Sequence, residues 1–493
     1  MTLREICIIL VSMKTAIIGR KQECARLDKC MREGNSQLVI VYGRRRVGKT
    51  FLINEYFHNR FAFKLTGAYG ESKAVQLESF TVELNRKTHQ KNKIPQNWRR
   101  AFEMLREYIE SLPRNEKCIV FFDEMPWLDT HKSGFLSAFE FFWNDYGSTV
   151  KNLVFIVCGS ATSWLTEHID HNRGGLFNRQ TCKLFLEPFN LRETEEYLLH
   201  KGIRWSRYDI VECYMVLGGI PYYLSLLDKE LSYLQNIDYL CFKKRAELWD
   251  EFDHLYHTLF SREGNHVLVV EELSKKGAGL TRAEVAQKTG LAPNGVLSKV
   301  LKNLVDSGFV RENISFGKKK KEILYQLSDY YSCFYFRYLK NRSGRDEHYW
   351  SNTLNTPSRK AWAGITFEQV CKDHIRQIKR KLGISGIVSE QYSWFVRPDQ
   401  QRDIRGAQID LIIDRRDRVI TLCEIKFSLD EFTINRDYEA KIRNRIETFR
   451  TISGTKKAIQ IAFITTYGVK TNMYSSIIQK QININDLFAE TES

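Results

Sequence analysis

The sequence lacks the features that mark several classes of protein. None of its 11 cysteines forms a Cys-x-x-Cys pair, so neither a zinc ribbon nor a disulfide framework is expected, and the cysteines suit a reducing cytosol. No apolar run approaches the ~18 residues that a membrane-spanning helix needs. Because the chain has only 8 prolines, long disordered linkers are not expected either. We therefore expect a folded, cytoplasmic protein without a membrane segment.

The length and the charge of the chain set two further expectations. A chain of 493 residues exceeds the ~250 to 300 residues at which a single hydrophobic core stops growing, which predicts two to four domains. The formal net charge is +16, and a field of that sign attracts polyanions. Nucleic acid, and DNA in particular, is therefore the expected partner.

The first residues do not have the pattern of a secretory signal. The stretch "MTLREICIILVSM" has a short apolar part and lacks a small-residue cleavage site. We interpret residues 1–14 as a leader, and Met13 offers an alternative start.

A phosphate-binding loop is predicted directly after an apolar strand. Residues 43–50, "GRRRVGKT", fit the pattern G-x-x-x-x-G-K-[ST], preceded by the strand Leu38 to Tyr42 and followed by a helix that begins near Lys49. Backbone N–H groups of such a loop surround the phosphates, the lysine reaches the β and γ phosphates, and the threonine hydroxyl binds Mg²⁺. Arg44 and Arg45 are expected at a solvated loop tip. The residues predicted to contact ATP here are Gly43, Arg46, Val47, Gly48, Lys49, Thr50 and Phe51.

Two later strands end in candidate catalytic side chains. "KCIVFFDE" ends in Asp123 and Glu124, where a P-loop ATPase needs one carboxylate for Mg²⁺ and one to polarise the attacking water. An acidic N-cap of the next helix is the alternative. "NLVFIVCGSAT" places Ser160 at a strand's carboxyl end, as a sensor of the γ-phosphate or as a plain helix N-cap.

Further candidates lie downstream. Arg173 and Arg179 fall in the glycine-bearing stretch "HNRGGLFNRQ", from which an arginine finger would reach the nucleotide of a neighbouring subunit. A homo-oligomer is one expectation from this reading, and surface salt bridges are the alternative. The break "GGIPYY" around Pro221 is interpreted as a lid turn that packs near the adenine.

Several motifs in this order resemble a known family. "GRRRVGKTFL", "FFDEMPWLDT", "IVCGSATSWL", "GGLFNR", "LEPFNLRETEEYL" and "GGIPYYLS" look like the archaeal and bacterial AAA-type ATPases related to STAND signal-transduction NTPases. The resemblance implies an ATPase core over residues 15–190, a helical lid over 191–262 and a winged helix over 263–328. It leaves the biological task open.

The pattern of residues 263–328 is that of a winged helix-turn-helix. Thr281 caps a short helix that ends at Gly290, a second helix runs from Gly295 to Ser307, and the strands "GFVREN" and "EILYQL" flank the turn "FGKKKK". The second helix would enter a DNA groove, while the wing would contact the backbone. The alternative is a packing module with a solvated hairpin tip. The candidate phosphate contacts are Lys299, Lys302, Lys318, Lys319, Lys320 and Lys321.

After a connector over residues 329–360, residues 361–493 predict an α/β unit with a mixed sheet. Its helix "WAGITFEQVCKDHIRQIKRKLG" carries Glu368, and the hairpin "QIDLIIDRRDRVITLCEIKFS" carries Asp410, Glu424 and Lys426. Strand alternation puts Glu424 and Lys426 on one face. A turn centred on Asp417, with a loop of three or five residues, would set Asp410 opposite Glu424.

The spacing of these side chains resembles the PD-(D/E)xK nuclease superfamily, although the leading "PD" is "ID" here. The likeness implies that Glu368 is the helix acid, that Asp410 and Glu424 bind a metal, and that Lys426 activates water. The family's ATPases commonly end in a domain of unknown function related to this nuclease fold. The alternative is a Glu424–Lys426 ion pair at a solvated sheet edge.

The sequence thus predicts an α/β multidomain protein: a P-loop parallel α/β/α ATPase core, a helical lid, a winged helix and a restriction-endonuclease-like domain. We expect an ATP-hydrolysing protein that uses ATP and Mg²⁺ and couples nucleotide state to DNA binding, with Mg²⁺-dependent DNA cleavage by the last domain. The alternative is a STAND-like regulatory switch whose last domain binds DNA or protein without catalysis.

Overall fold

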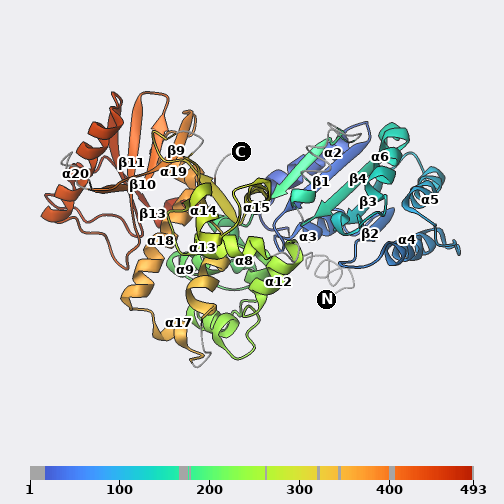
Figure 1. The fold of residues 1–493 in the computed structure, drawn as a ribbon, viewed down its shortest axis with the longest axis horizontal. Coiled ribbons are helices and arrows are strands. Elements are labelled where there is room, and N and C mark those ends of the chain that lie inside the picture. Colours follow the sequence, from blue (N-terminus) through green and yellow to red (C-terminus); the bar gives the residue numbers. More distant parts are fainter. Residues whose placement is uncertain are drawn as a thin grey trace, which may run out of the picture. The chain divides into compact units, whose positions relative to one another are not determined.

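A computed structural model gives the fold of the chain (Figure 1). It describes residues 17–160, 162–165, 176, 179–260, 264–318, 322–341, 346–398 and 406–490. The chain forms two compact units, Met1–Pro188 and Phe189–Ser493. The second unit therefore contains the residues predicted as lid, winged helix, connector and C-terminal domain. Among the helices that the structure describes, none combines the length and the apolar character needed to cross a membrane.

The first unit is built on a five-stranded parallel sheet in the order β2-β3-β4-β1-β5. Its strands are β1 (Gln37–Gly43), β2 (Phe63–Thr66), β3 (Cys118–Asp123), β4 (Leu153–Gly159) and β5 (Cys182–Leu186). Its helices are α2 (Lys21–Arg32), α3 (Lys49–Tyr56), α4 (Lys73–Thr88), α5 (Trp98–Ser111), α6 (Phe135–Asp145) and α7 (Thr162–Leu165), with the 3-10 turns η1 (Met125–Trp127) and η2 (Gly147–Thr149). The predicted parallel α/β core is confirmed.

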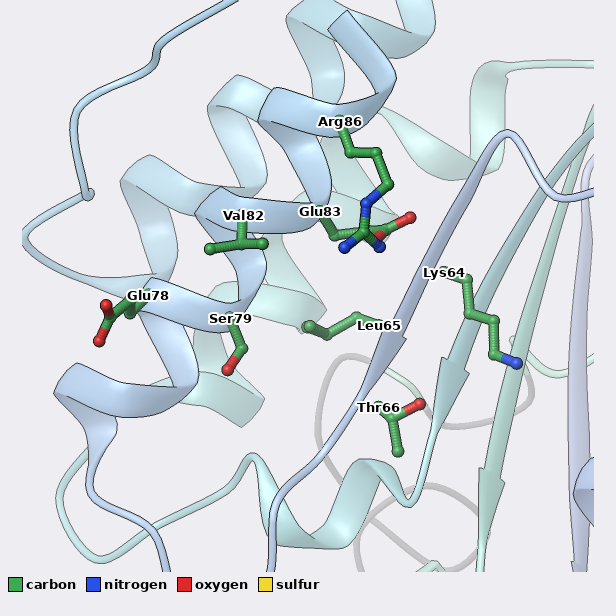
Figure 2. A pocket seen from close by; sticks show the side chains of 8 residues that line it. All are labelled: Lys64, Leu65, Thr66, Glu78, Ser79, Val82, Glu83 and Arg86. Atoms are coloured by element: carbon green, nitrogen blue, oxygen red, sulfur yellow. The ribbon is translucent and has the colours of Figure 1, made fainter. Parts of the chain in front are cut away.

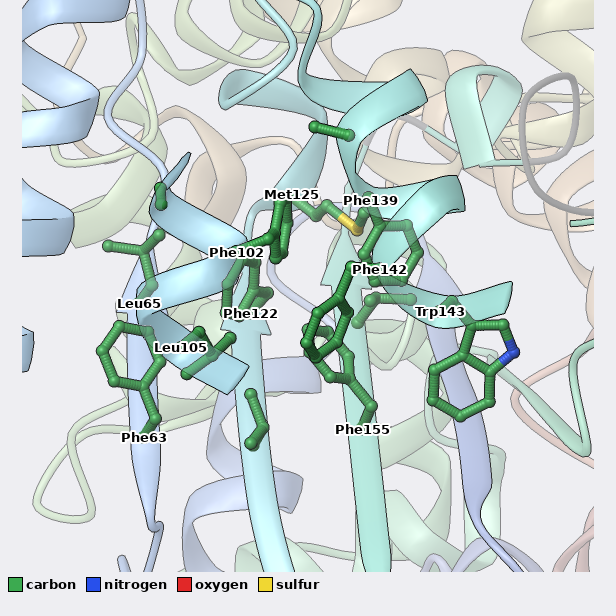
Figure 3. Close-up of a cluster of buried hydrophobic side chains, with 14 of the residues drawn as sticks. Phe63, Leu65, Phe102, Leu105, Phe122, Met125, Phe139, Phe142, Trp143 and Phe155 are labelled. Atoms are coloured by element: carbon green, nitrogen blue, oxygen red, sulfur yellow. The ribbon is translucent and has the colours of Figure 1, made fainter. Parts of the chain in front are cut away.

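An aromatic layer holds α5 and α6 against this sheet (Figure 3). Phe122 of β3 and Phe155 of β4 meet with ring centroids 5.0 Å apart, and Phe102 of α5 stacks on Phe142 of α6 at 5.2 Å. All four rings are at most 3% exposed. Burial of such large apolar surfaces stabilises the packing of these helices on the sheet.

The second unit contains helices and two further sheets. Its α-helices are α8 (Leu191–His200), α9 (Arg207–Leu217), α10 (Pro221–Ser225), α11 (Tyr233–Ile237), α12 (Glu251–Leu259), α13 (Asn265–Ser274), α14 (Arg282–Thr289), α15 (Gly295–Asp306), α16 (Tyr330–Phe334), α17 (Tyr349–Asn352), α18 (Pro357–Asp373), α19 (Ile375–Leu382) and α20 (Arg436–Ser453). It also has the π-helices η4 (Asp238–Phe242) and η6 (Tyr335–Leu339) and the 3-10 helices η7 (Ser475–Ile477) and η8 (Ile484–Phe488). Its strands are β6 (Leu280–Thr281), β7 (Val310–Asn313), β8 (Leu324–Leu327), β9 (Ser389–Val396), β10 (Ala407–Arg415), β11 (Val419–Lys426), β12 (Ala458–Thr465) and β13 (Lys480–Asn483).

The helix pair and hairpin predicted around residues 280–327 are present. Thr281 and Glu284 form a capping box at the start of α14, and Gly290 ends that helix in a left-handed conformation. α15 follows, and β7 and β8 pair in an antiparallel sheet of order β6-β8-β7. These individual elements are confirmed, whereas their assignment as a DNA-binding winged helix stays a prediction.

The C-terminal sheet is mixed, in the order β13-β12-β11-β10-β9. β11 pairs antiparallel with β10 and parallel with β12, as predicted. The register Leu411↔Cys423 to Asp414↔Ile420 is centred on Asp417 and leaves a three-residue loop, 416–418. Arg418 has φ +66°, which suits the last residue of a three-residue hairpin loop. The predicted register is therefore confirmed, and its continuation sets Asp410 opposite Glu424.

One predicted helix is two helices in the structure. The stretch from residue 362 to 383 was expected to be one helix, but α18 ends at Asp373 and α19 begins at Ile375. Between them, the buried ring of His374 bonds through Nδ1 to the Val370 carbonyl (2.8 Å) and accepts the Leu191 N–H at Nε2 (2.9 Å). The break lets this ring satisfy a backbone donor of α8.

The hairpin tip between β7 and β8 packs against the C-terminal sheet. Ser315 forms a parallel bridge with Ser393 of the edge strand β9, and the Phe316 N–H donates to the Ser393 carbonyl (2.9 Å). The Phe316 ring lies 5.1 Å from that of Phe449 in α20 and 5.4 Å from that of Tyr392. The tip therefore covers a sheet edge that would otherwise expose unpaired backbone groups.

We predict that Phe316→Ala destabilises the second unit more than Phe395→Ala does. Phe316 packs against the C-terminal core, whereas Phe395 is 61% exposed. Removal of the packed ring should lower the free energy of unfolding by about 1–3 kcal/mol. Denaturant unfolding followed by tryptophan fluorescence measures both variants. Equal midpoints for the two variants would contradict the packing role of Phe316.

Candidate functional site

The loop between β1 and α3 has the backbone that phosphate binding requires. Gly43 has φ +141°, and a Cβ there would lie 2.5 Å from the Leu186 carbonyl oxygen, while Gly48 has φ +88°. Lys49 is 5% exposed, and its Nζ donates to the carbonyls of Gly43 (3.0 Å) and Arg44 (2.8 Å). Burial lowers the pKa of this ammonium, an effect that nearby carboxylates oppose. The loop thus presents a desolvated cation next to its own backbone.

One arginine of this loop is more buried than the sequence predicted. Arg44 was predicted at a solvated tip, but it is 6% exposed. Its carbonyl accepts the bond from buried Lys49, which holds the residue inside the loop. Arg46 has φ +71°, a strained conformation for a residue with a side chain, and Val47 is buried. The prediction for Arg44 was therefore wrong, whereas Arg45 is partly exposed.

Three strand ends bring the predicted catalytic side chains together. The Thr50 hydroxyl donates to the Asp123 carboxylate (2.8 and 3.1 Å). The Ser160 hydroxyl lies 3.0 and 2.9 Å from the two carboxylate oxygens of Glu124, and its N–H donates to the same group (3.1 Å). Glu124 has φ +45°, a left-handed conformation that costs a residue with a side chain about 1–3 kcal/mol. The backbone strain and the serine together fix the direction of the Glu124 carboxylate.

Arg20 is a positioning residue that sequence reasoning missed. Its guanidinium is 6% exposed and donates to the carbonyls of Val47 in the phosphate loop (3.0 Å) and Glu187 after β5 (2.7 Å). It therefore ties the loop to the neighbouring strand end. No local pattern points to this role, because one of the two partners lies 167 positions away in the sequence.

The remaining nucleotide candidates are placed as follows. Phe51 is 47% exposed on α3. Arg179 is exposed and forms no ion pair with any residue that the structure describes, while Arg173 lies outside the described residues. Pro221 is the first residue of α10 in the second unit, so its approach to the adenine stays a prediction.

A pocket of about 600 Å³ lies elsewhere in the first unit, between the edge strand β2 and α4 (Figure 2). Lys64, Glu78, Glu83 and Arg86 contribute charged side chains to its lining, and Arg86 pairs with Glu83 at 2.6 Å. None of the predicted nucleotide contacts lines it. The pocket therefore serves as a control location for tests of the phosphate loop.

The C-terminal sheet gathers the second set of candidates at the end of β11. Asp410 is 8% exposed and accepts the Ile425 N–H (3.2 Å). Glu424 is 7% exposed, and its Oε1 lies 2.8 Å from Lys426 Nζ. The predicted common face of Glu424 and Lys426 is confirmed. Their pair does not lie at a sheet edge, as the alternative reading had it, because β11 runs between β10 and β12.

Two residues of α20 at this site were missed. The Tyr438 hydroxyl donates to Glu424 Oε1 (2.5 Å), and Arg445 donates to Glu424 Oε2 (2.5 Å). They are seven residues apart, which puts both on one face of the helix. This spacing was available in the sequence as a signal, although nothing in it named Glu424 as the partner.

The surroundings shift the pKa values of the three carboxylates at this site in different directions. Burial and the nearby Asp410 raise the pKa of Glu368 to about 7. Burial and Glu424 raise the pKa of Asp410. Burial alone would raise the pKa of Glu424, but Lys426 and Arg445 lower it below its ordinary value. Of the three carboxylates, Glu424 is thus the one whose charged form its surroundings favour.

Lys426 is held in its charged form. Burial would lower its pKa, but Glu424 and Asp410 outweigh that effect and raise the pKa. An ammonium donates hydrogen bonds and does not accept a proton. This favours orientation of water or phosphate by Lys426 over proton abstraction.

The lysines predicted to contact DNA lie on two elements. Lys299 and Lys302 lie on α15, where Lys302 approaches Asp306 at 3.9 Å. Lys318 pairs with Glu322 at 2.9 Å beside the docked Phe316. Lys319, Lys320 and Lys321 lie outside the described residues. Ser315 and Phe316, on the same hairpin, contact Ser393 of β9.

Both sites offer oxygen ligands to a cation. Among the described residues, no group of three or more histidine, cysteine, aspartate or glutamate side chains is arranged to hold a metal. A hydroxyl with a carboxylate, or two carboxylates, nevertheless suit Mg²⁺, which usually keeps several waters and takes further ligands from a phosphate. The donor chemistry at Thr50 with Asp123, and at Asp410 with Glu424, therefore fits Mg²⁺ better than zinc.

Two known proteins are similar in sequence to this chain. An uncharacterised protein of Methanocaldococcus jannaschii is 24% identical over 414 residues, which is 83% of this chain and 87% of that protein. An uncharacterised ATP-binding protein of the same organism is 44% identical over 43 residues, 9% of this chain and 73% of its own length.

Among solved structures, a Walker-type ATPase of Pyrococcus abyssi aligns with a TM-score of 0.48 and 19% identity, over 65% of this chain and 96% of its own. Likeness this remote carries no argument about function. Residues 18–227, however, match the family described as "ATPase domain predominantly from Archaea". This stretch, less than half of the chain, is therefore similar to the ATPase domain of that family.

Proposed function

We propose that this protein binds and hydrolyses ATP with Mg²⁺ and that its nucleotide state controls its engagement of DNA. The single observation that carries the ATPase part is the contact of Thr50 with Asp123, beside Glu124, at the carboxyl ends of β1 and β3. Ligands of open parallel sheets bind at this edge. The match of residues 18–227 to an ATPase family supports the same reading.

Each residue then has a role in hydrolysis. Lys49 would exchange its loop carbonyls for phosphate oxygens, and Thr50 with Asp123 would hold Mg²⁺, which neutralises charge on the phosphates. Glu124 would orient the attacking water. Ser160 now bonds Glu124, and a γ-phosphate that competes for the same hydroxyl would release the carboxylate toward water.

The C-terminal part of the proposal is Mg²⁺-dependent DNA cleavage. Asp410 and Glu424 would hold Mg²⁺, which stabilises charge on a phosphodiester and lowers the pKa of bound water. Lys426 would orient the phosphate or the water, and Glu368, with its pKa near neutral, would complete the acidic group. Support comes from two nearly buried carboxylates beside a lysine and from the net charge of +16.

One observation favours a second candidate, a regulatory switch whose C-terminal domain is not catalytic. Lys426, Arg445 and Tyr438 all bond Glu424, so its charge is already neutralised. A metal would have to compete with these partners for the oxygens of the carboxylate. In a STAND-like switch this cluster would be a buried structural ion pair, and DNA or protein would bind without cleavage.

We predict that Lys49→Ala weakens ATP binding. Loss of a charge-assisted contact to phosphate should raise the Kd for a fluorescent ATP analogue by about 10- to 100-fold. Arg86→Ala, in the pocket beside β2, is the matched control and should bind as wild type does. Equal affinity of the Lys49 and Arg86 variants would remove the phosphate-loop assignment.

Ser160→Ala separates binding from turnover. Because the serine contacts Glu124 and not the loop, we expect ATP affinity within about 3-fold of wild type but a kcat at least about 10-fold lower. Ser79→Ala, whose hydroxyl bonds only within α4, should leave kcat unchanged. A steady-state phosphate-release assay measures both. Unchanged kcat in Ser160→Ala would refute the sensor role.

Lys426→Ala tests the cleavage site. Arg445 still pairs with Glu424 in this variant, so the fold should persist, which circular dichroism checks. We expect Mg²⁺-dependent cleavage of linear DNA to fall by about 100-fold or more, and chelation of Mg²⁺ to abolish wild-type cleavage. Lys441→Ala, exposed on α20, is the control. Wild-type cleavage by Lys426→Ala would favour the regulatory switch.

A further inference from the structure

A column of aromatic rings ends at the surface near the candidate cleavage site. Tyr208 of α9 stacks on Phe427 with centroids 5.0 Å apart and planes 17° apart. On Tyr467 it stacks at 6.1 Å and 10°. Phe427 also meets Phe367 of α18 at 5.0 Å. Three nearly parallel rings thus follow one another from half-buried Phe427 through half-buried Tyr208 to Tyr467, which is 46% exposed.

The rings of this column are close to the candidate cleavage site both along the sequence and in the sheet. Phe427 directly follows Lys426, and Phe367 directly precedes Glu368. Lys426 pairs in register with Thr465 of β12, two residues before Tyr467. The Ser428 N–H donates to the Thr466 hydroxyl (2.9 Å), which joins the segments that follow β11 and β12. The end of the column therefore lies beyond the same strand ends that carry Glu424 and Lys426.

These two segments expose other apolar side chains. Leu429, after β11, is 56% exposed, and Met473, after β12, is 79% exposed. The segments are bridged by Phe432 and Val469, and the Phe432 N–H donates to the Gly468 carbonyl (2.9 Å). Both of these bridged segments thus carry exposed apolar side chains, and exposed apolar groups that gather commonly mark binding sites.

We propose that the Phe427–Tyr208–Tyr467 column is a stacking platform for the unpaired bases of single-stranded DNA, delivered to the carboxylate site. An unpaired base can continue a column of parallel rings, whereas the bases of a duplex are already stacked on one another. A chain with a net charge of +16 attracts the phosphates. Two cations that are each 30% exposed lie near the column: Lys426 at the end of β11, and Arg445 of α20, which pairs with Glu424. This inference rests on the proposed function, and it names the substrate as single-stranded or frayed DNA.

The test is binding of a labelled thymidine oligomer of about 16 nucleotides, and of a blunt duplex, in EDTA, so that cleavage plays no part. Tyr467→Ala should bind the single strand roughly 5- to 100-fold more weakly and the duplex as wild type does. Tyr467→Phe keeps the ring and should bind as wild type does. Tyr239→Ala, a 51% exposed tyrosine of the same unit, is the control. Thermal melting checks that each variant folds.

The outcomes distinguish this inference from the proposed function. If wild type binds DNA but Tyr467→Ala affects neither substrate, or both equally, the platform is wrong and the proposed function stands. If wild type binds neither substrate, the DNA partner and the platform both fall. A selective loss of single-strand binding that Tyr467→Phe restores supports the platform.

Discussion

The two candidate sites of this protein depend on one physical constraint, the cost of burying charged side chains. Lys49 is buried among backbone carbonyls, and Asp410 and Glu424 are less than a tenth exposed. A buried charge is costly unless it is paired or binds something. Lys49 begins the helix that follows β1, and Glu424 lies near the carboxyl end of β11, opposite Asp410 near the start of β10. Backbone groups and neighbouring side chains supply partial compensation at both places. A polyphosphate with Mg²⁺ at one site, and a phosphodiester with Mg²⁺ at the other, would supply the remainder.

The second unit is cross-linked by buried polar contacts as well as by packing. Arg359 of α18 is 2% exposed and pairs with Glu212 of α9 and the hydroxyl of Tyr233 in α11. Burial raises the pKa of Glu212 to about 7, an effect that Arg359 opposes. Together with His374 and the docked Phe316, these contacts join the helices after Phe189 to the C-terminal sheet. These contacts hold the helices after Phe189 and the C-terminal sheet together within one unit.

Short-range sequence patterns allowed the local structure to be predicted, but they did not predict the long-range contacts. The phosphate loop, the capping box at Thr281 and the hairpin register around Asp417 follow from neighbours in the sequence. Burial of Arg44, the helix break at His374 and the contacts of Arg20 depend on partners or packing that no local pattern specifies. The ion pair of Glu424 with Lys426 was foreseen, but its place in a central strand and its neutralisation by Arg445 were not.

We propose, as the central claim, that the nucleotide bound to this protein controls its engagement of DNA. The most direct measurement is the rate at which purified protein cleaves linear, circular and branched DNA with Mg²⁺ and ATP, ADP or no nucleotide. The account predicts cleavage that requires Mg²⁺, prefers DNA with unpaired or free ends, and changes severalfold in rate between ATP and ADP. Cleavage at the same rate in all three nucleotide conditions would contradict the coupling, and absence of cleavage in every condition would contradict a catalytic C-terminal site.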